Sequence, residues 1–469
     1  MGGQYDGSAQ KVNDLGAERA RLTRGRGYRF PVKLVAHGFL WLFFYLALAV
    51  APLLFAFAGG APEGRGFWTE LSVALGFVGL ALLGLQFAVT ARSNGVDAPY
   101  GLDVVLRFHR QMSFVGFAFV LAHPTILFLT GAAPWALLRV WDAPWRARLG
   151  VTAVVALTLL LVTSVWRQGL RLSYEAWRLA HGVLAAVIMV TALAHVDGVG
   201  HYVSGPWRRS LWAVMSLCVV ALLIWVRIVK PVLILRRPWR LTAVTARAPG
   251  VHSLLLEADG HDGMRFQAGQ FAWLTVGRSP LRLTEHPFSI SSSAEDHDRV
   301  ELTIKALGDF TSTVGDLEPG TRVYLDGPYG VFSYERNEAA GFVFVAGGIG
   351  ITPILSMLRT LADRSDRRPV VLLYANSDAD SIAFAQELDV LAGRLDLHLV
   401  HVLESPPPGW AGASGFVDAD VLARHLSEHP ERFEHFVCGP APLMDAVTEA
   451  IHGLGVPDER IHTERFDFI

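Results

Sequence analysis

The sequence predicts a six-helix transmembrane bundle followed by a small β-barrel domain and a doubly wound α/β domain. Three observations predict this fold class. Of 469 residues, 52% are hydrophobic and 18% are charged, whereas about a quarter of the residues of an ordinary soluble domain are charged. The long apolar stretches all lie before about residue 232. From Pro238 onward the apolar runs are short and are separated by Gly, Pro and Asp, as in a soluble α/β region.

Six apolar stretches are long enough to cross a hydrocarbon core of about 30 Å. They span roughly residues 33–58, 68–90, 105–130, 149–166, 175–196 and 209–230. Basic residues cluster before the first stretch and after the sixth, so the positive-inside rule places both termini in the cytoplasm. Arg139, Arg146 and Arg148 lie in a loop that this topology makes external, against the rule. We expect no cleaved signal and a multi-pass protein of the plasma (inner) membrane, in contact with lipid.

The change from long to short apolar runs along the chain indicates the expected domains. These are a cytoplasmic tail, a membrane domain, a β-barrel domain and an α/β domain, over residues 1–30, 31–235, 236–336 and 337–469. The formal net charge of −2 provides no basic excess for phosphate backbones, so nucleic acid is not an expected partner. Cys218 and Cys438 lie far apart in the sequence, which argues against a disulfide scaffold or a cysteine-ligated cluster.

Four histidines repeat one spacing on two of the expected spans. His109 and His123 are 14 residues apart on the third span, and His181 and His195 are 14 residues apart on the fifth. Fourteen helical steps return to nearly the same face about 21 Å further along. If the two helices face each other in the same direction, His109 meets His181 and His123 meets His195. Two such bis-imidazole sites would suit six-coordinate haem iron.

Other interpretations of these histidines stay open. A single membrane histidine can bond a neighbouring helix or serve a proton path, and zinc would need cysteine or carboxylate ligands that these faces lack. His37, on the first span, has no mate at the same spacing and remains unassigned.

Two segments of the barrel region are candidates for cofactor binding. In the stretch His286-Pro287-Phe288-Ser289-Ile290-Ser291-Ser292, backbone N–H groups and the Ser289 hydroxyl could face the polar edge of a flat ring, although a plain turn is the alternative. The second segment runs from Lys305 to Thr311 and contains Gly308. Bare amides at such a strand end could hold a pyrophosphate.

A glycine turn follows the expected strand from Phe342 to Ala346. It reads Gly347-Gly348-Ile349-Gly350-Ile351-Thr352-Pro353 and leads into an expected helix with Thr352 as its N-cap and Pro353 at its first position. Glycines let the chain approach a phosphate closely, and a helix N-terminus supplies N–H donors, so we interpret this segment as a dinucleotide turn. Pro353 replaces the third glycine of an ordinary dehydrogenase motif.

Two further segments point toward the same crevice. Cys438-Gly439-Pro440 ends another expected strand with a small side chain, and the chain stops at Glu464-Arg465-Phe466-Asp467-Phe468-Ile469. A terminal aromatic residue could stack on a flat ring. Simple packing of the last strand is the other interpretation.

Together these segments resemble the ferredoxin–NADP reductase superfamily joined to a ferric-reductase-type transmembrane domain, as in NADPH oxidases and ferric reductases. The resemblance covers about residues 33–469. It implies FAD, two b-type haems and NADPH or NADH as cofactors. It further implies that the four histidines ligate the haems and that the His286 and Gly308 segments hold FAD. The Gly347 turn and the Cys438 segment would hold the nicotinamide nucleotide. Ser289, Cys438 and Phe466 would lie at the site of hydride transfer, where Phe466 resembles the aromatic residue that stacks on the ring and Phe468 is the alternative.

One departure concerns the choice of nucleotide. Many relatives carry an arginine after the strand equivalent to Val370 to Tyr374, but here the sequence continues Asn376-Ser377-Asp378-Ala379-Asp380. A carboxylate at this place would repel a 2′-phosphate and could accept a hydrogen bond from a ribose hydroxyl. NADH is therefore at least as well suited as NADPH.

The resemblance implies transmembrane electron transfer from cytosolic NAD(P)H to an acceptor on the far side. The sequence leaves that acceptor open between oxygen, in a superoxide-producing oxidase, and ferric chelates, in a ferric reductase. An electron-donating membrane subunit for a periplasmic partner protein is one alternative. A proton or ion conduit gated by a nucleotide-binding domain, with the histidines as a relay, is another.

Overall fold

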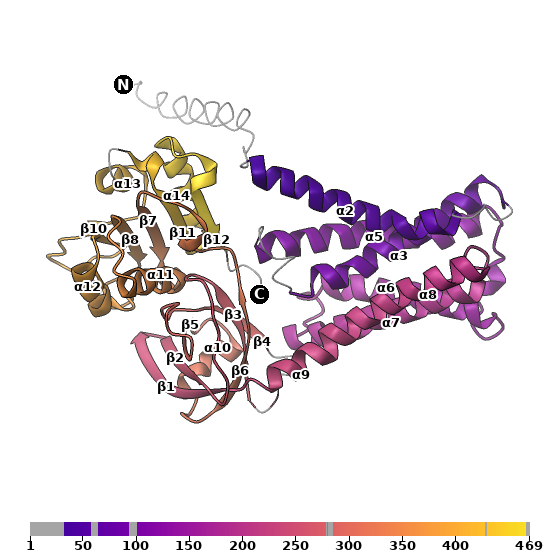
Figure 1. Cartoon of the computed structure of the whole chain (residues 1–469), viewed down its shortest axis with the longest axis horizontal. Coiled ribbons are helices and arrows are strands. Elements are labelled where there is room, and N and C mark those ends of the chain that lie inside the picture. Colours follow the sequence, from indigo (N-terminus) through magenta and orange to yellow (C-terminus); the bar gives the residue numbers. More distant parts are fainter. Residues whose placement is uncertain are drawn as a thin grey trace, which may run out of the picture.

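The computed structural model of the chain describes residues 32–57, 64–92, 101–277, 279, 285–426 and 429–465. Long helices form one part of the molecule and two β-containing lobes form the other (Figure 1). The basic tail before Val32, the side chain of His37, and the terminal Phe466 and Phe468 lie outside the described residues.

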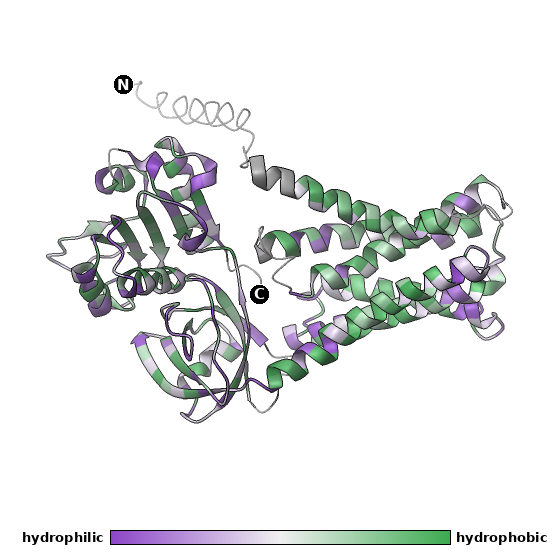
Figure 2. Ribbon diagram, in the orientation of Figure 1, coloured by the Kyte–Doolittle hydropathy of each residue, from purple (hydrophilic) through white to green (hydrophobic). Residues whose placement is uncertain are grey.

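The described residues contain six helices that are long and apolar enough to cross a membrane, which confirms the predicted six-helix bundle. They are α2 (Val32–Phe57), α3 (Phe67–Val89), α5 (Leu102–Leu129), α6 (Trp145–Val165), α7 (Tyr174–Val199) and α8 (Pro206–Ile224). Helix α8 continues through the π-helical turn η2 (Trp225–Val229) into α9 (Lys230–Leu235). Hydrophobic residues run along the helices and hydrophilic residues gather toward their ends (Figure 2). A helix satisfies its own backbone hydrogen bonds, as the interior of a bilayer requires.

Glycines bring the central helices close together. A Cβ added at Gly79 of α3 would lie 2.9 Å from Val120 of α5, and one added at Gly116 of α5 would lie 3.0 Å from Leu83 of α3. Small residues allow this approach because dispersion contacts between close backbones hold membrane helices together. Helix α7 begins at a Ser173 cap, whose side chain accepts from the Ala176 N–H, and ends at left-handed Gly200.

The first lobe is a six-stranded antiparallel sheet in the order β4-β3-β6-β1-β2-β5. Its strands are β1 (Trp239–Ala248), β2 (Val251–Ala258), β3 (Phe271–Val276), β4 (Glu285–Ser289), β5 (Arg299–Lys305) and β6 (Arg322–Tyr329), with the short helix α10 (Asp309–Ser312) after β5. A bridge between Ile290 and Leu302 joins the two edges of the sheet. The sheet therefore closes into the predicted β-barrel.

The second lobe is a parallel six-stranded sheet in the order β10-β9-β8-β7-β11-β12. Its elements are β7 (Phe342–Gly347), α11 (Ile351–Asp363), β8 (Val370–Asn376), α12 (Ala385–Arg394), β9 (Leu397–Leu403), β10 (Ala413–Ser414), α13 (Ala419–His425), β11 (Glu434–Cys438), α14 (Ala441–Gly453) and β12 (Ile461–Glu464). The strand order reverses between β7 and β11. In a doubly wound sheet, ligands bind at the carboxyl ends of the strands at this switch point.

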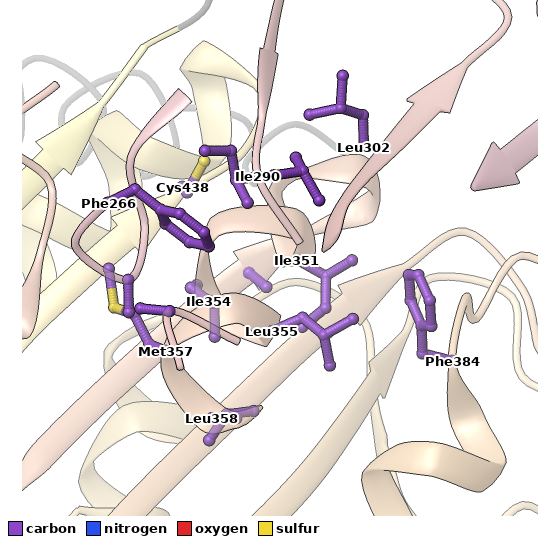
Figure 3. Packing of buried hydrophobic residues seen from close by; sticks show 14 of the residues in the cluster. Phe266, Ile290, Leu302, Ile351, Ile354, Leu355, Met357, Leu358, Phe384 and Cys438 are labelled. Atoms are coloured by element: carbon purple, nitrogen blue, oxygen red, sulfur yellow. The ribbon is translucent and has the colours of Figure 1, made fainter. Parts of the chain in front are cut away.

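One hydrophobic core joins the two lobes. Phe266, Ile290 and Leu302 of the barrel pack in the same cluster as Ile351 and Leu355 of α11 (Figure 3). Polar contacts strengthen the junction: the Ser356 hydroxyl donates to the Ser292 carbonyl at 2.7 Å, and the Arg359 guanidinium donates to the Ser291 carbonyl at 2.8 Å. The barrel and the α/β sheet therefore pack on each other through a continuous core.

Candidate functional site

One matched pair of histidines meets across two membrane helices. The rings of His109 on α5 and His181 on α7 lie 6.4 Å apart between centroids, as the equal spacing predicts. We call His109 and His181 the inner pair, because the cavity between them also reaches the barrel. We call His123 and His195, which lie further along the same two helices, the outer pair.

All four imidazoles use the same ring nitrogen for a hydrogen bond. The Nδ1 atom of His109 lies 3.0 Å from Gln86 Oε1, that of His123 lies 2.9 Å from Ser72 Oγ, that of His181 lies 3.2 Å from Ser164 Oγ, and that of His195 lies 2.7 Å from the Arg146 carbonyl. Among the described residues no recorded hydrogen bond involves any of the four Nε2 atoms. A metal-ligating histidine characteristically bonds a partner through one ring nitrogen and the metal through the other.

The hydrogen-bond partners of the four histidines come from two different helices. Helix α3 supplies Ser72 and Gln86, which hold both histidines of α5, whereas α6 supplies Ser164 and the Arg146 carbonyl, which hold both histidines of α7. Sequence reasoning missed all four partners.

Glycines make room beside the outer pair. A Cβ added at Gly76 would lie 3.2 Å from the His123 ring, and one added at Gly150 would lie 3.0 Å from the His195 ring. No group of three or more metal-ligating His, Cys, Asp or Glu side chains occurs in the described parts of the chain.

A cavity of about 1100 Å³ surrounds the inner pair and extends to the barrel. Apolar side chains of the bundle line it together with six cations, Arg92, Arg110, Arg167, Arg178, Arg227 and Lys230. The barrel contributes Thr275, Glu285, Tyr324 and Asp326. A cavity of this size can enclose a large planar ligand.

The two barrel segments singled out in the sequence come together in space. His286 of β4 stacks on Phe310 of α10, with ring centroids 4.1 Å apart and planes 9° apart, and Phe288 lies 6.3 Å from the same ring. Pro287 lies between these two residues and pairs with Trp273 of β3. Phe310 follows Gly308 closely, but sequence reasoning did not identify it as a site residue. The aromatic group formed by His286, Phe288 and Phe310 is the natural boundary for a flat ring.

The serines of the His286 segment have different surroundings. Ser291 and Ser292 are buried and bonded to the barrel: Ser291 Oγ donates to the Glu301 carbonyl at 3.1 Å, and Ser292 Oγ accepts from the Glu301 N–H at 3.1 Å. Their backbone carbonyls bind α11, as described above. Ser289 is buried as well, and no recorded hydrogen bond of the described residues uses its hydroxyl.

The turn from Lys305 to Thr311 differs in one respect from the expected phosphate cradle. The N–H groups of Leu307 and Gly308 are not bare, because both donate to Thr311 Oγ1 at 2.9 Å in a local cap. Gly308 itself has open space where a side chain would stand, and Lys305 is exposed at the strand end. The open side of the turn thus offers Lys305 and the Gly308 backbone rather than these two amides.

His286 gives the barrel a pH dependence. Burial lowers the pKa of His286 below the ordinary histidine value of about 6.5, so below that pH the unfolded chain binds a proton that the folded chain does not. The stability from neutral His286 is therefore present above about pH 6.5 and is lost as the pH falls. We expect His286→Asn to flatten the loss of thermal stability between about pH 7.5 and 5. An unchanged slope in the variant would assign the acid sensitivity to other histidines.

The glycine turn and the Cys438 segment form one crevice. Ala346 of β7 pairs with Cys438 of β11, and a Cβ added at Gly350 would lie 2.2 Å from the Cys438 carbonyl. Gly347 is similarly close to Pro440, at 2.8 Å, and Gly439 lies against the Gly347 backbone. Gly348 differs, because its φ is +51° and nothing lies within 4 Å of an added Cβ. The first set of glycines closes the two turns on each other, and Gly348 faces open space.

The prediction that Thr352 caps the helix is wrong. A 3-10 turn, η5 (Gly348–Gly350), already turns the chain, so α11 begins at Ile351 with Gly350 as its N-cap. Thr352 and Pro353 lie inside the first turn, where the Thr352 hydroxyl donates to the Ile349 carbonyl at 3.0 Å. Neither side chain is exposed to the crevice, because both are buried.

Cys438 is fully buried at the end of β11. Its side chain belongs to the shared core of the two lobes, the cluster that also contains Phe266 and Ile351 (Figure 3). Burial raises the pKa of Cys438 well above its ordinary value, so the side chain stays a neutral thiol. It can contribute shape and a polarizable surface, but not a thiolate.

The segment after β8 presents a fixed carboxylate. Asp378 Oδ1 accepts from the Ser381 N–H at 2.9 Å, and Asp378 Oδ2 accepts from the Ser377 hydroxyl at 3.1 Å. These hydrogen bonds lower the pKa of Asp378, with the bond from the Ser381 N–H the largest cause. The group is therefore an anion at neutral pH, at the carboxyl end of the strand next to β7.

Three family models match successive parts of the chain. Residues 75–192 match the ferric reductase like transmembrane component, residues 254–333 match an FAD-binding domain, and residues 344–449 match the oxidoreductase NAD-binding domain. These matches confirm the predicted resemblance, and the chain is an oxidoreductase that combines a membrane domain with a flavin and nicotinamide nucleotide module.

Curated relatives match the C-terminal half. A ferredoxin–NADP reductase B from Sorangium cellulosum is 31% identical over 236 residues, which are 49% of this chain and 96% of that protein. An NADH-cytochrome b5 reductase 1 from Pyricularia oryzae is 33% identical over 175 residues, which are 36% of this chain and 57% of that protein. The chain thus spans little more than half the length of the Pyricularia relative.

Solved structures resemble the same half. The cytochrome b5 reductase domain of Ulva prolifera nitrate reductase is 22% identical, with a TM-score of 0.43, and the match covers 48% of this chain and 96% of that one. The FAD/NAD-binding domain of nitric oxide dioxygenase from Vibrio cholerae is 25% identical, with a TM-score of 0.44, covering 49% and 98%.

Proposed function

We propose that this chain, which belongs to the ferredoxin–NADP reductase family through its C-terminal half, transfers electrons from NADH or NADPH across a membrane. A ferric-reductase-like transmembrane domain precedes that half. The proposed cofactors are FAD and two b-type haems. The observation that carries the proposal is the arrangement of the four histidines. All four imidazoles are held through Nδ1 at two levels of the same two helices, and the inner pair lies in a cavity that the barrel also lines.

The residues fit the haems. His109 and His181 would ligate one iron, and His123 and His195 would ligate the other, each through Nε2, because Nδ1 is held by a neighbour in all four. Those neighbours fix the orientation of each ring and the nitrogen that carries the proton. Bound haem would supply a one-electron carrier whose potential depends on its axial ligands. The glycines beside His123 and His195 leave the rings room to turn toward a shared partner.

The barrel residues fit FAD. The flavin ring would be bordered by His286, Pro287, Phe288 and Phe310, and its polar edge would accept a hydrogen bond from Ser289. The phosphates would lie beside Lys305, Gly308 and Thr311. The segment itself would be supported by Ser291 and Ser292, which bond to the barrel. Bound FAD would accept electrons as a hydride pair and release them singly.

The crevice between β7 and β11 fits the nicotinamide nucleotide. Gly348 leaves open space for a phosphate beside the start of α11, and Gly347, Gly350, Gly439 and Pro440 hold the two turns together. Cys438 would form the floor and Phe466 would cover the ring. The ionised, fixed Asp378 would repel a 2′-phosphate, so we expect NADH to be used in preference to NADPH.

The acceptor and the orientation complete the proposal. With both termini in the cytoplasm, the inner pair is on the cytosolic side and electrons leave near the outer pair. Oxygen and ferric chelates are the two acceptors that this arrangement serves. A negative charge that moves outward from a negative-inside cell is favoured by about 2.3 kcal/mol per 100 mV.

An anaerobic absorbance titration of the purified protein tests the proposal. We expect NADH to bleach a flavin and then to produce the reduced bands of b-type haem, and we expect NADPH in a parallel cuvette to act more slowly. Oxygen or a ferric chelate, admitted afterwards, would reoxidise the haems and so identify the acceptor. A protein without haem absorbance would remove the ligand role of all four histidines.

A further inference from the structure

A group of charged residues joins the membrane helices to the barrel beside the flavin segment. The barrel side is built from three neighbouring strands: Glu285 on β4, Trp273 on β3, and Asp326 with Tyr329 on β6. Glu285 directly precedes His286. In the sheet Trp273 is the register partner of both Pro287 and Asp326, so the group is one continuous patch on the edge of the barrel.

The membrane side contributes cations from three separate segments. Arg92 follows the end of α3, Arg178 lies in the second turn of α7, and Lys230 begins α9. Arg92 Nη2 lies 2.9 Å from Glu285 Oε1 and Arg178 forms an ion pair with the same oxygen. Two arginines from two helices therefore converge on one carboxylate.

Asp326 makes the second connection. Its Oδ2 lies 3.0 Å from Lys230 Nζ and 3.4 Å from Arg92 Nη1, and its Oδ1 accepts from the Tyr329 hydroxyl at 2.6 Å. The Arg92 guanidinium also lies 3.8 Å from the centre of the Trp273 ring, within the range of a cation–π contact. The charged side chains are 12–19% exposed, so water and salt screen these pairs far less than surface pairs.

The helices joined to the barrel by these ion pairs are those that position the inner histidines. Helix α3 carries Gln86, which bonds His109, and α7 carries His181 one turn beyond Arg178. On the barrel side, Glu285 lies on β4, the strand that carries the His286 segment. The ion pairs of Glu285 and Asp326 therefore connect the flavin segment to the helices that position the inner histidine pair.

We propose that Glu285, together with Arg92 and Arg178, acts as a positioning clamp that sets the separation of the flavin segment and the inner histidine pair and so controls electron transfer from the barrel into the membrane. This inference rests on the proposed function. The ion pairs lie on β4, β6 and the membrane helices, whereas the nicotinamide crevice lies between β7 and β11. The clamp should therefore govern electron transfer from the flavin to the haem and not hydride transfer from the nicotinamide to the flavin.

The test uses the full-length protein in detergent with three variants, Glu285→Gln, Arg178→Gln and the double variant. Anaerobic stopped-flow spectroscopy after mixing with NADH resolves flavin bleaching from haem reduction. We expect each single variant to bleach its flavin at the wild-type rate and to reduce haem about tenfold more slowly or worse, because small displacements cost large factors in transfer rates. The double variant should be no slower than the slower single one, since both remove the same contact.

Hydrogen–deuterium exchange gives a readout that needs no haem. Peptides from β4 and β6 should exchange faster in the Glu285→Gln and Arg178→Gln variants. Arg240→Gln is the matched control, because Arg240 pairs with Asp259 on the exposed surface of the barrel, at 3.2 Å, and this change should alter neither haem reduction nor exchange in β4 and β6.

Several outcomes would overturn the clamp. Wild-type haem reduction with unchanged exchange in the variants would show that the contacts do not set the separation. Loss of flavin bleaching in Glu285→Gln would show that this residue acts on the flavin site itself. A wild-type protein without haem bands would instead overturn the proposed function, and the exchange experiment would still decide whether the ion pairs hold the barrel on the bundle.

Discussion

Replacing His181 with Ala should halve the haem content of the purified protein and reduce NADH-driven reduction of an acceptor beyond the membrane to background. The side chain faces His109 at 6.4 Å between ring centroids, and no other imidazole of the described residues is recorded beside that pair. A six-coordinate site that loses one axial ligand loses both affinity and the potential set by that ligand. The haem content is measured from the pyridine haemochrome spectrum, and bleaching of the flavin by NADH should persist.

Two variants of α6 calibrate this result. Ser164→Ala removes only the hydroxyl at 3.2 Å from His181 Nδ1, so it should keep both haems and shift the reduction potential of one. Thr158→Val is the matched control, because the Thr158 hydroxyl bonds the Val154 carbonyl of its own helix and its side chain is exposed. Full haem content in His181→Ala would contradict the assignment of the inner pair.

Replacing Gly348 with Ala should raise the KM for NADH about tenfold or more while the flavin stays bound. Gly348 has a left-handed φ of +51°, and an added Cβ would enter the open space at the end of β7. The conformation costs an alanine about 1–2 kcal/mol, and the methyl group occupies the space that a phosphate would approach. Steady-state reduction of the flavin at varied NADH measures the effect.

Gly455→Ala separates strain from obstruction. Gly455 has a φ of +87° with nothing within 4 Å of an added Cβ, and it follows the far end of α14, about 20 Å from the crevice by the length of that helix. It should lose similar stability and keep the wild-type KM. An equal rise of the KM in both variants would mean that Gly348 does not border the nucleotide.

The parts of the architecture that depend on local periodicity could be predicted from the sequence. Six apolar runs became six helices, because a bilayer leaves few alternatives for such a segment. The equal 14-residue spacing placed His109 opposite His181. The order strand, glycine turn, helix placed the Gly347 turn between β7 and α11, although the helix began one residue before Thr352.

The contacts that depend on distant pairs could not be predicted. Glu285 and Arg92 are separated by 193 positions, and only the closed barrel and the folded bundle bring them together. The cap of Thr311 on the Leu307 and Gly308 amides depends on rotamers that no motif specifies. One signal was available: Ser72 and Gln86 on α3 are also 14 residues apart, the same spacing as the two histidines that they hold.

Sided electron transfer in sealed vesicles tests the central claim most directly. The purified protein is reconstituted into liposomes that enclose ferricyanide, which does not cross the bilayer, and NADH is added outside to the molecules whose nucleotide module faces out. The account predicts loss of the internal ferricyanide absorbance in step with NADH oxidation, and no such loss with the His181→Ala variant. NADH oxidation that leaves the internal ferricyanide untouched, in vesicles shown to hold the intact protein, would contradict transmembrane electron transfer.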